Sequence, residues 1–312
     1  MKHFLLLMFF IFLSPLFYAF ISITKAYLVG KKGIPFLFNY FTLIKLFQKN
    51  SVYSKSTTII FKVAPAINLA VVLLALMFLP IANFPSMLSF KGDVLFIFYA
   101  LTLGKVFMVF AGIDTASSFE GMGCAREVFF SALGELVLFL IFIMFYRLTG
   151  ELEFNTYFVE GKLILYSKAT LFPILFISVA LFFILLLENA RVPVDDPQTH
   201  LELTMIHEVM ILDHSGPDLG IIHLTSQLKM FFYAAFISNL LIPINLSINT
   251  GLNILTPFNK LIAFLAILVL IYITVGVVES SMARYQLKRV PKFILSSLVL
   301  VVLATILTWR WP

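Results

Sequence analysis

The sequence predicts an all-α membrane protein with about eight transmembrane helices, a cytoplasmic amphipathic helix and a helical acidic loop. Hydrophobic residues make up 61% of the 312 residues and charged residues only 12%. This is about half the charge of a typical soluble chain, and no soluble core could hide so much apolar surface. The single cysteine, Cys124, also excludes a disulfide scaffold and any iron–sulfur or zinc site built from several cysteines.

Eight stretches are apolar and long enough to cross a hydrocarbon layer of about 30 Å, which takes about 20 helical residues. Their predicted limits are 4–24, 63–82, 94–113, 128–147, 168–187, 230–248, 261–281 and 293–310. The first stretch is longer than the apolar part of a secretory signal, and no cleavage site of small residues follows it cleanly. We therefore expect a retained helix there, and a single membrane domain over 1–312 without internal repeats.

The basic residues predict which loops face the cytoplasm. The loops after the first, third, fifth and seventh spans contain 14 Lys and Arg residues, against 7 on the opposite side. Loops with an excess of Lys and Arg stay in the cytoplasm, so both termini are expected outside. The predicted cytoplasmic loops are 25–62, 114–127, 188–229 and 282–292.

Lysines dominate the first cytoplasmic loop. From Lys25 to Lys62 there are seven lysines and no acidic residue. The KKGIP sequence at 31–35 predicts a break, and the stretch that follows it, up to Asn50, predicts an amphipathic helix at the membrane surface. Anionic lipid or an acidic partner suits this charge better than nucleic acid, for which nothing else in the sequence argues.

The segment 188–229 carries the densest set of ionisable groups, with seven acidic residues and four of the five histidines. Apolar residues at helical spacing predict one helix that starts after Asp196 and ends at Gly216. Clustered acids and histidines beside a membrane suit a proton relay, and a solvated or partner-facing helix is the alternative. The candidate residues for proton transfer or coupling in this segment are Glu188, Arg191, Asp195, Asp196, Glu202, His207, Glu208 and Asp213.

Three histidines of this segment, His200, His207 and His214, are seven residues apart and would share one face of the predicted helix. At this spacing the side chains lie about 10 Å apart along a helix, which is too far for one metal ion. No second histidine follows His207 and Glu208 at the spacing of a metalloprotease motif. We therefore predict no metal ligands in this chain.

Glu188 and Arg191 are three residues apart at the predicted end of the fifth span. They could form a helical ion pair or take part in coupling, and the sequence leaves both open. The loop 114–127 is rich in small residues, which let a neighbouring helix or a partner approach the backbone closely. Its charged residues, which we expect to dock a partner, are Asp114, Glu120, Arg126 and Glu127.

Two charges lie inside the predicted spans. Glu135 is about 12 Å deep in the fourth span by helix rise, and Lys105 lies at a similar depth in the third. An unpaired charge at such a position costs about 2.5–3.5 kcal/mol, which pairing or an internal water-filled path would relieve. We expect at least one of them to belong to a proton route, with a purely structural buried pair as the alternative. Glu279, near the inner end of the seventh span, is a weaker candidate.

Two stretches carry a resemblance to a known family: ENARVPVDDPQTHLELTMIHEVMILDHSGPD at 188–218 and GIDTASSFEGMGCARE at 112–127. They closely resemble the membrane subunit shared by formate hydrogenlyase and the group 4 nickel–iron (NiFe) hydrogenases, the hydrogenase-4 component C type. The chain is similar, more distantly, to subunit 1 of respiratory complex I, which forms much of the quinone chamber. The resemblance extends over nearly the whole chain.

The resemblance implies a non-catalytic subunit that anchors an oxidoreductase complex and links cytoplasmic redox chemistry to proton or sodium translocation. It implies no cofactor in this chain. NiFe and iron–sulfur centres would lie on hydrogenase large and small subunits and an iron–sulfur subunit at the cytoplasmic face, beside antiporter-like membrane subunits, in the inner membrane of a bacterium or archaeon. Glu188, Arg191, Asp195 and Asp196 occupy the acidic-loop positions of the family, and Glu135 occupies the acidic position after the glycine-rich loop.

One departure from the family pattern separates the branches. Complex I subunits continue the acidic loop with Phe-Asp-Leu, where this chain has Val194, Asp195, Asp196 and Pro197. This favours the hydrogenase branch. Two alternatives stay open, a quinone-chamber subunit of a complex I-like quinone oxidoreductase and a stand-alone ion or solute transporter. The lack of internal repeats argues against the transporter.

Overall fold

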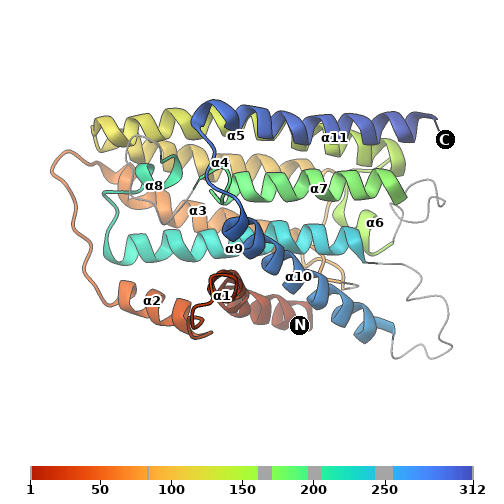
Figure 1. Cartoon of the computed structure of the whole chain (residues 1–312), viewed down its shortest axis with the longest axis horizontal. Coiled ribbons are helices and arrows are strands. Elements are labelled where there is room, and N and C mark those ends of the chain that lie inside the picture. Colours follow the sequence, from red (N-terminus) through yellow and green to blue (C-terminus); the bar gives the residue numbers. More distant parts are fainter. Residues whose placement is uncertain (1, 83, 161–170, 196–204, 243–255, 311–312) are drawn as a thin grey trace.

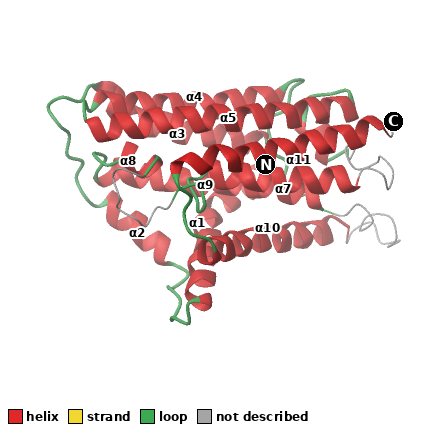
Figure 2. Cartoon of the chain, turned by 45° about the horizontal axis from the view of Figure 1, so that its top comes forward, coloured by secondary structure: helices red, strands yellow, loops and turns green. Residues whose placement is uncertain are grey.

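The protein, described here by a computed structural model, is an elongated bundle of helices (Figure 1). The structure describes residues 2–82, 84–160, 171–195, 205–242 and 256–310. Figure 2 shows helices joined by loops, and no β-strand occurs among these residues. The all-α prediction is confirmed.

Long helices occur at all eight predicted spans. Among the described residues they are α1 (Lys2–Leu28), α3 (Ile59–Phe78), α4 (Asp93–Asp114), α5 (Ser118–Thr149), α7 (Leu171–Glu188), α9 (Gly216–Leu241), α10 (Thr256–Ser281) and α11 (Val290–Arg310). Six of these are long and apolar enough to cross a membrane. The other two are α7, whose apolar part Phe172–Glu188 is shorter, and α9, whose first half is more polar.

Short helices fill the connections: α2 (Phe38–Phe47), α6 (Phe154–Phe158), α8 (His207–Met210) and the 3-10 helix η3 (Leu287–Arg289). The predicted amphipathic helix is confirmed by α2, which buries Leu43 and exposes Phe41. The sequence did not predict α6. Its first backbone N–H, that of Phe154, donates to the buried Asp93 carboxylate at the start of α4 over 3.0 Å.

Helix α9 forms the centre of the bundle and packs against α1, α3, α7 and α10. Every residue from Met230 to Leu240 is buried, as expected for a helix that is surrounded on all sides. Aromatic rings pack around Phe236, including Phe98 of α4 and Phe145 of α5. A side chain on this half of α9 is therefore held in the interior, between the other helices.

The prediction of one helix from Asp196 to Gly216 is wrong. Gly216 has a positive φ of +55° and, followed by Pro217, starts α9 instead of ending a helix. The physical reason is that proline fits the first turn of a helix, where its missing N–H costs no hydrogen bond. Asp196 lies outside the described residues, as does His200. His207 begins α8 and His214 follows it in a loop, so these two histidines do not share a helical face.

Helix α5 begins at Ser118, ten residues before its predicted span, so most of the predicted loop 114–127 is helical. The α8 region covers this added part of α5. A Cβ atom at Gly123 would lie 3.0 Å from the carbonyl oxygen of Ile206 and 3.1 Å from the backbone nitrogen of Met210. The small residues here do allow close approach, and the segment that approaches belongs to the same chain.

We predict that Gly123→Leu lowers the stability of the folded chain by about 1–3 kcal/mol, because the added side chain overpacks the contact between α5 and α8. The matched control is Gly121→Leu, since nothing lies within 4 Å of a Cβ at Gly121 in the same helix. Thermal unfolding of the purified protein in detergent measures both. Equal unfolding temperatures for the two variants would contradict the close packing.

Candidate functional site

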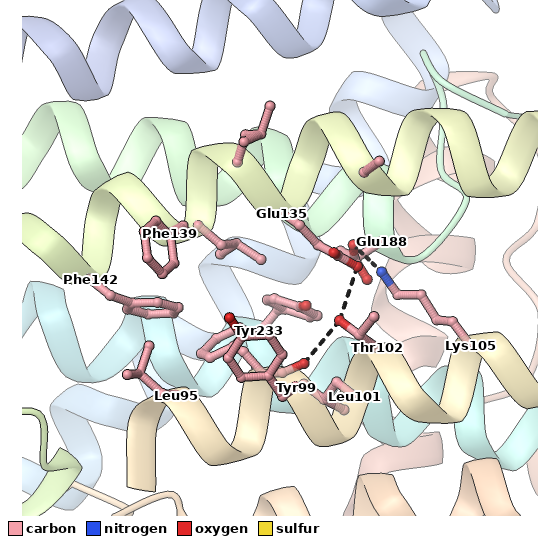
Figure 3. Close-up of a pocket in the computed structure, with 14 residues that line it drawn as sticks. Leu95, Tyr99, Leu101, Thr102, Lys105, Glu135, Phe139, Phe142, Glu188 and Tyr233 are labelled. Atoms are coloured by element: carbon pink, nitrogen blue, oxygen red, sulfur yellow. Dashed lines mark hydrogen bonds and ion pairs between the residues drawn. The ribbon is translucent and has the colours of Figure 1, made fainter. Parts of the chain in front are cut away.

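Buried charges gather where α4, α7 and α9 meet (Figure 3). The ammonium group of Lys105 on α4 donates to Oε1 of Glu188 over 2.6 Å. Lys229 on α9 lies 2.9 Å from Oε2 of Glu188 and donates to its backbone carbonyl over 2.8 Å. The Glu188 side chain is only 1% exposed. A carboxylate so far from water is stable only with close partners, and here each of its oxygens has a lysine.

The end of α7 places Glu188 in this position. Ala190, just after the helix, adopts a positive φ of +49°, and the Arg191 N–H donates back to the Leu186 carbonyl over 2.9 Å. This is the hydrogen-bond pattern of a Schellman helix end. It keeps Glu188 in the last turn, facing into the bundle, and takes Arg191 out of the helix.

Glu135 lies beside this cluster on α5 (Figure 3) and joins it through the Ser131 hydroxyl group. Its Oε1 accepts hydrogen bonds from Thr102 at 2.9 Å and from Ser131 at 3.3 Å. Lys105 in turn donates to the Ser131 hydroxyl over 3.1 Å. The two predicted membrane charges therefore do not pair directly, and a hydroxyl group links them. Polar groups form one continuous path: Lys229, Glu188, Lys105, Ser131 and Glu135.

A cavity of about 360 Å³ lies beside this path, between α4, α5 and α9. Aliphatic and aromatic side chains such as Leu95, Phe139 and Tyr233 line most of it, while Glu135 and Glu188 lie at its polar end (Figure 3). Two smaller cavities, of about 40 and 10 Å³, also reach Glu188. Three cavities of the described chain thus meet at this one carboxylate.

The smaller cavities bring in two further predicted residues. Glu127 of α5 lines both of them, and His207 lines the larger one together with Lys105 and Lys229. These cavities therefore extend from Glu188 towards α8. The docking role expected for Glu127 and the role in proton transfer or coupling expected for His207 both stay predictions.

A second set of buried charges connects α1, α10 and the chain after α7. Arg191 donates to Oε1 of Glu279 over 2.9 Å, and Lys25 lies 3.0 Å from Oε2 of the same carboxylate. The Glu279 side chain is fully buried, and the guanidinium of Arg191 also lies 4.3 Å from the centre of the Tyr18 ring. The helical ion pair considered for Glu188 and Arg191 is therefore wrong, because the helix end turns the two side chains towards different partners.

The Asp195 carboxylate binds two other parts of the chain. Its Oδ2 accepts hydrogen bonds from the backbone N–H groups of Ile206 and His207, both at 3.0 Å. Its Oδ1 lies 2.9 Å from Arg284, which follows α10. Asp195 thus connects the start of α8, which follows the 196–204 segment in the sequence, to the α10–α11 connection. The predicted residues Asp196 and Glu202 lie in that segment, outside the described residues.

Three of the predicted docking residues hold other parts of this chain. Asp114 accepts hydrogen bonds from the backbone N–H and the hydroxyl of Thr58 at the start of α3. The buried Glu120 accepts from the Asp213 N–H over 3.0 Å, and Arg126 donates to the Met205 carbonyl over 2.8 Å. The contacts of Glu120 and Arg126 thus hold the residues on either side of α8 against α5. A docking role for these three residues stays a prediction, as does a role in proton transfer or coupling for the half-buried Glu208 and the exposed Asp213.

The sequence interpretation missed the partners of the acidic groups. Lys25, Lys229 and Arg284 counted only as evidence for topology, yet each pairs with a buried carboxylate. A signal existed for Lys229. Once Gly216 and Pro217 are taken as a helix start, Lys229 falls 13 residues, about 20 Å, inside that helix.

No group of three or more His, Cys, Asp and Glu side chains in the described residues is placed to hold a metal ion. Cys124 is buried, and its thiol donates to the Val109 carbonyl over 3.4 Å. The carboxylates, lysines and hydroxyl groups of the described site are groups that can exchange protons and interact electrostatically.

His214 forms a separate feature between α8 and α9. Its ring stacks on Phe61 with 3.9 Å between the ring centres. Neither ring nitrogen has a hydrogen-bond partner among the described residues. Burial lowers the pKa of His214 to about 4, although the nearby charges of Asp218 and Asp213 oppose this shift. The histidine is therefore a neutral packing residue at neutral pH.

Known proteins resemble this chain over almost its whole length. A family model described as NADH dehydrogenase matches residues 2–310. Hydrogenase-4 component C of Escherichia coli (strain K12) is 25% identical over 272 residues, which cover 87% of this chain and 84% of the relative. Formate hydrogenlyase subunit 4 of the same organism is 23% identical over 282 residues, 89% of each chain.

A solved structure has the same fold. A chain in the structure of the membrane-bound sulfane sulfur reductase, an archaeal respiratory membrane complex, matches with a TM-score of 0.80. The match covers 98% of this chain and 97% of that chain at 18% identity. At this identity the match establishes the fold alone.

We predict that Glu279→Gln lowers the free energy of unfolding by about 3–5 kcal/mol, because it leaves the charges of Arg191 and Lys25 without their buried partner. Asp213→Asn is the control, since that side chain is exposed. Denaturant unfolding in detergent compares the two variants. A loss below about 1 kcal/mol for Glu279→Gln would show that the cluster is not a structural tie.

We also predict that the stability of the protein falls as the pH drops from about 6.5 to about 4. In this range an unfolded histidine binds a proton, whereas folded His214 does not. His214→Phe keeps the stacking on Phe61 and should remove this part of the pH dependence. His207→Phe, at a half-buried position, should keep it. Unfolding temperatures of the wild type and both variants are measured across this pH range. An unchanged pH dependence of the unfolding temperature in His214→Phe would show that His214 does not cause it.

Proposed function

The chain belongs to the NADH dehydrogenase family, and on this premise we propose that it is the anchoring and coupling subunit of an energy-converting hydrogenase complex of the formate hydrogenlyase type. In this role it links redox chemistry in partner subunits to proton or sodium translocation. The names of the two curated relatives support the hydrogenase branch. The observation that carries the coupling role is the buried path from Lys229 through Glu188 and Lys105 to Glu135.

The proposed complex divides the work between subunits. Hydrogenase large and small subunits and an iron–sulfur subunit would carry the NiFe and iron–sulfur centres and dock at the end of the bundle formed by α8 and the start of α9. Antiporter-like membrane subunits would continue the ion path. The excess of Lys and Arg in the loops at that end supports its placement in the cytoplasm, with both termini outside and the chain in the inner membrane.

Lys105 is the link between the two carboxylates of the path. It touches Glu188 directly and reaches Glu135 through the Ser131 hydroxyl. Charges a few ångströms apart interact strongly where water is excluded. A proton that reaches Glu188 removes the charge that holds Lys105, and the ammonium group then interacts more strongly with Glu135. Protonation at one end of the path thus changes the proton affinity at the other.

The end of α7 connects this path to the acidic segment. Glu188 belongs to the first charge cluster, and Arg191, three residues later, belongs to the second. Asp195, four residues after Arg191, pairs with Arg284 and so connects the chain before α8 to the α10–α11 connection. A partner that moves the chain between α7 and α8 would displace Asp195 and Arg191. Through the end of α7 it would also displace the carboxylate of Glu188. Redox events in the partner could in this way change the proton affinity of the path.

We predict that Glu188→Gln and Glu135→Gln leave the complex assembled but slow turnover by at least about tenfold, or uncouple it, because each removes a proton-binding group from the path. Glu188→Gln should in addition lower the stability of this chain, because Lys105 and Lys229 lose their buried partner. Glu153→Gln, beyond the other end of α5, is the control and should behave like the wild type. Hydrogen production and acidification are measured together in inverted membrane vesicles. Normal ion pumping in a variant with both carboxylates replaced would contradict the proposed path.

Purification tests the membership of the complex. An affinity tag on this chain should recover, from mild detergent, a nickel-containing subunit that evolves hydrogen. Recovery of a nickel-free complex that reduces quinone would favour the complex I-like alternative. A chain that purifies alone and transports a solute into liposomes would overturn both redox functions.

A further inference from the structure

The N-terminal third of the chain has an unusual distribution of charge. Residues 1–92 contain nine lysines and no acidic residue, since all 16 Asp and Glu residues lie at Asp93 or beyond. Of these lysines, Lys25 is neutralised by Glu279, and Lys62 lies over the Tyr53 ring. The function proposed above uses none of the others.

Four of the remaining lysines lie in the segment Tyr27–Lys49, which we call the α1–α2 segment. They are Lys31, Lys32, Lys45 and Lys49. All four are exposed, and none forms an ion pair with a carboxylate in the described part of the chain. The segment therefore presents uncompensated positive charge.

The same segment exposes large apolar side chains. Every residue from Tyr27 to Phe38 is exposed, and Tyr27 and Val29 reach 83% and 63%. In α2, Phe41 and Phe47 are 56% and 47% exposed. Water would penalise such a surface, and a lipid layer could cover it along its whole length.

The position of the segment suits the membrane interface. It follows directly after the apolar stretch Leu7–Leu28 of α1, and Figure 2 shows that the α1–α2 connection projects away from the bundle. Contacts fasten only the inner edge of α2 to the bundle: Asn39 donates to the Pro15 carbonyl of α1 over 2.9 Å, and Leu46 packs against Gly220 of α9. Aromatic and Lys side chains together at the end of a span are typical of the level of the lipid headgroups.

We propose that the α1–α2 segment is a binding site for anionic phospholipid. The ammonium groups of Lys31, Lys32, Lys45 and Lys49 contact the phosphate groups, while the aromatic side chains of the segment enter the boundary of the acyl chains. Lysine stems allow this, because they lie along apolar surface and place the charge in the headgroup layer. The site is independent of the proton path and of the identity of the docked subunits.

The experiment measures lipid binding by the intact complex, purified in neutral detergent. Fluorescent phosphatidylglycerol is titrated against the complex and compared with phosphatidylcholine of the same chain length. The wild type should prefer phosphatidylglycerol, and added salt should reduce the preference. Lys31→Gln/Lys32→Gln and Lys45→Gln/Lys49→Gln should each weaken phosphatidylglycerol binding by about tenfold or more, since each lysine near an anionic surface contributes substantially.

Two further variants make the test specific. Lys91→Gln/Lys288→Gln removes two exposed lysines elsewhere and should change binding less than about twofold. Phe41→Ser should weaken both lipids equally and leave the preference intact, because it removes only apolar contact. Equal binding of the two lipids by the wild type, or an equal loss in the Lys91 control, would overturn the proposal. So would unchanged lipid binding combined with loss of a subunit in the lysine variants, which would identify an acidic protein as the partner.

Discussion

The carboxylate of Glu188, held between Lys105 and Lys229, is the interaction on which the interior of this protein depends. Removing a carboxylate from water costs several kcal/mol, and only close opposite charges and hydrogen bonds offset this cost. Because the two lysines come from α4 and α9, the requirement to pair Glu188 fixes both helices against the end of α7. The hydroxyl of Ser131 extends the constraint to α5.

The long helices could be predicted from the sequence because the length of an apolar stretch is a local property. Two helix limits were predicted wrongly, the start of α5 and the start of α9, because contacts between helices determine where these two helices begin. Helix α5 extends back to Ser118, since α8 covers its first turns and Gly123 lets the backbones approach. Gly216 and Pro217 are compatible with the start and the end of a helix, and only the packing of α9 selects the start.

The site could be predicted only in part, for a similar reason. Lys105, Glu135 and Glu188 stand out in the sequence because a charge in an apolar stretch is costly. Their partners do not, since pairing depends on which helices become neighbours. Glu188 lies 83 residues from Lys105 and 41 from Lys229. Lys25 looked like a topology signal at the end of α1 and is in fact one of two partners of Glu279.

The two charge clusters differ in a way that matters for coupling. In the first, two lysines face two carboxylates, Glu188 and Glu135, so a proton gained or lost changes a balanced set. In the second, Arg191 and Lys25 pair with Glu279, and arginine does not release its proton in proteins. The second cluster therefore suits the transmission of force, and the first suits the movement of protons. The hydrogen-bonded end of α7 joins them, because Glu188 and Arg191 are three residues apart.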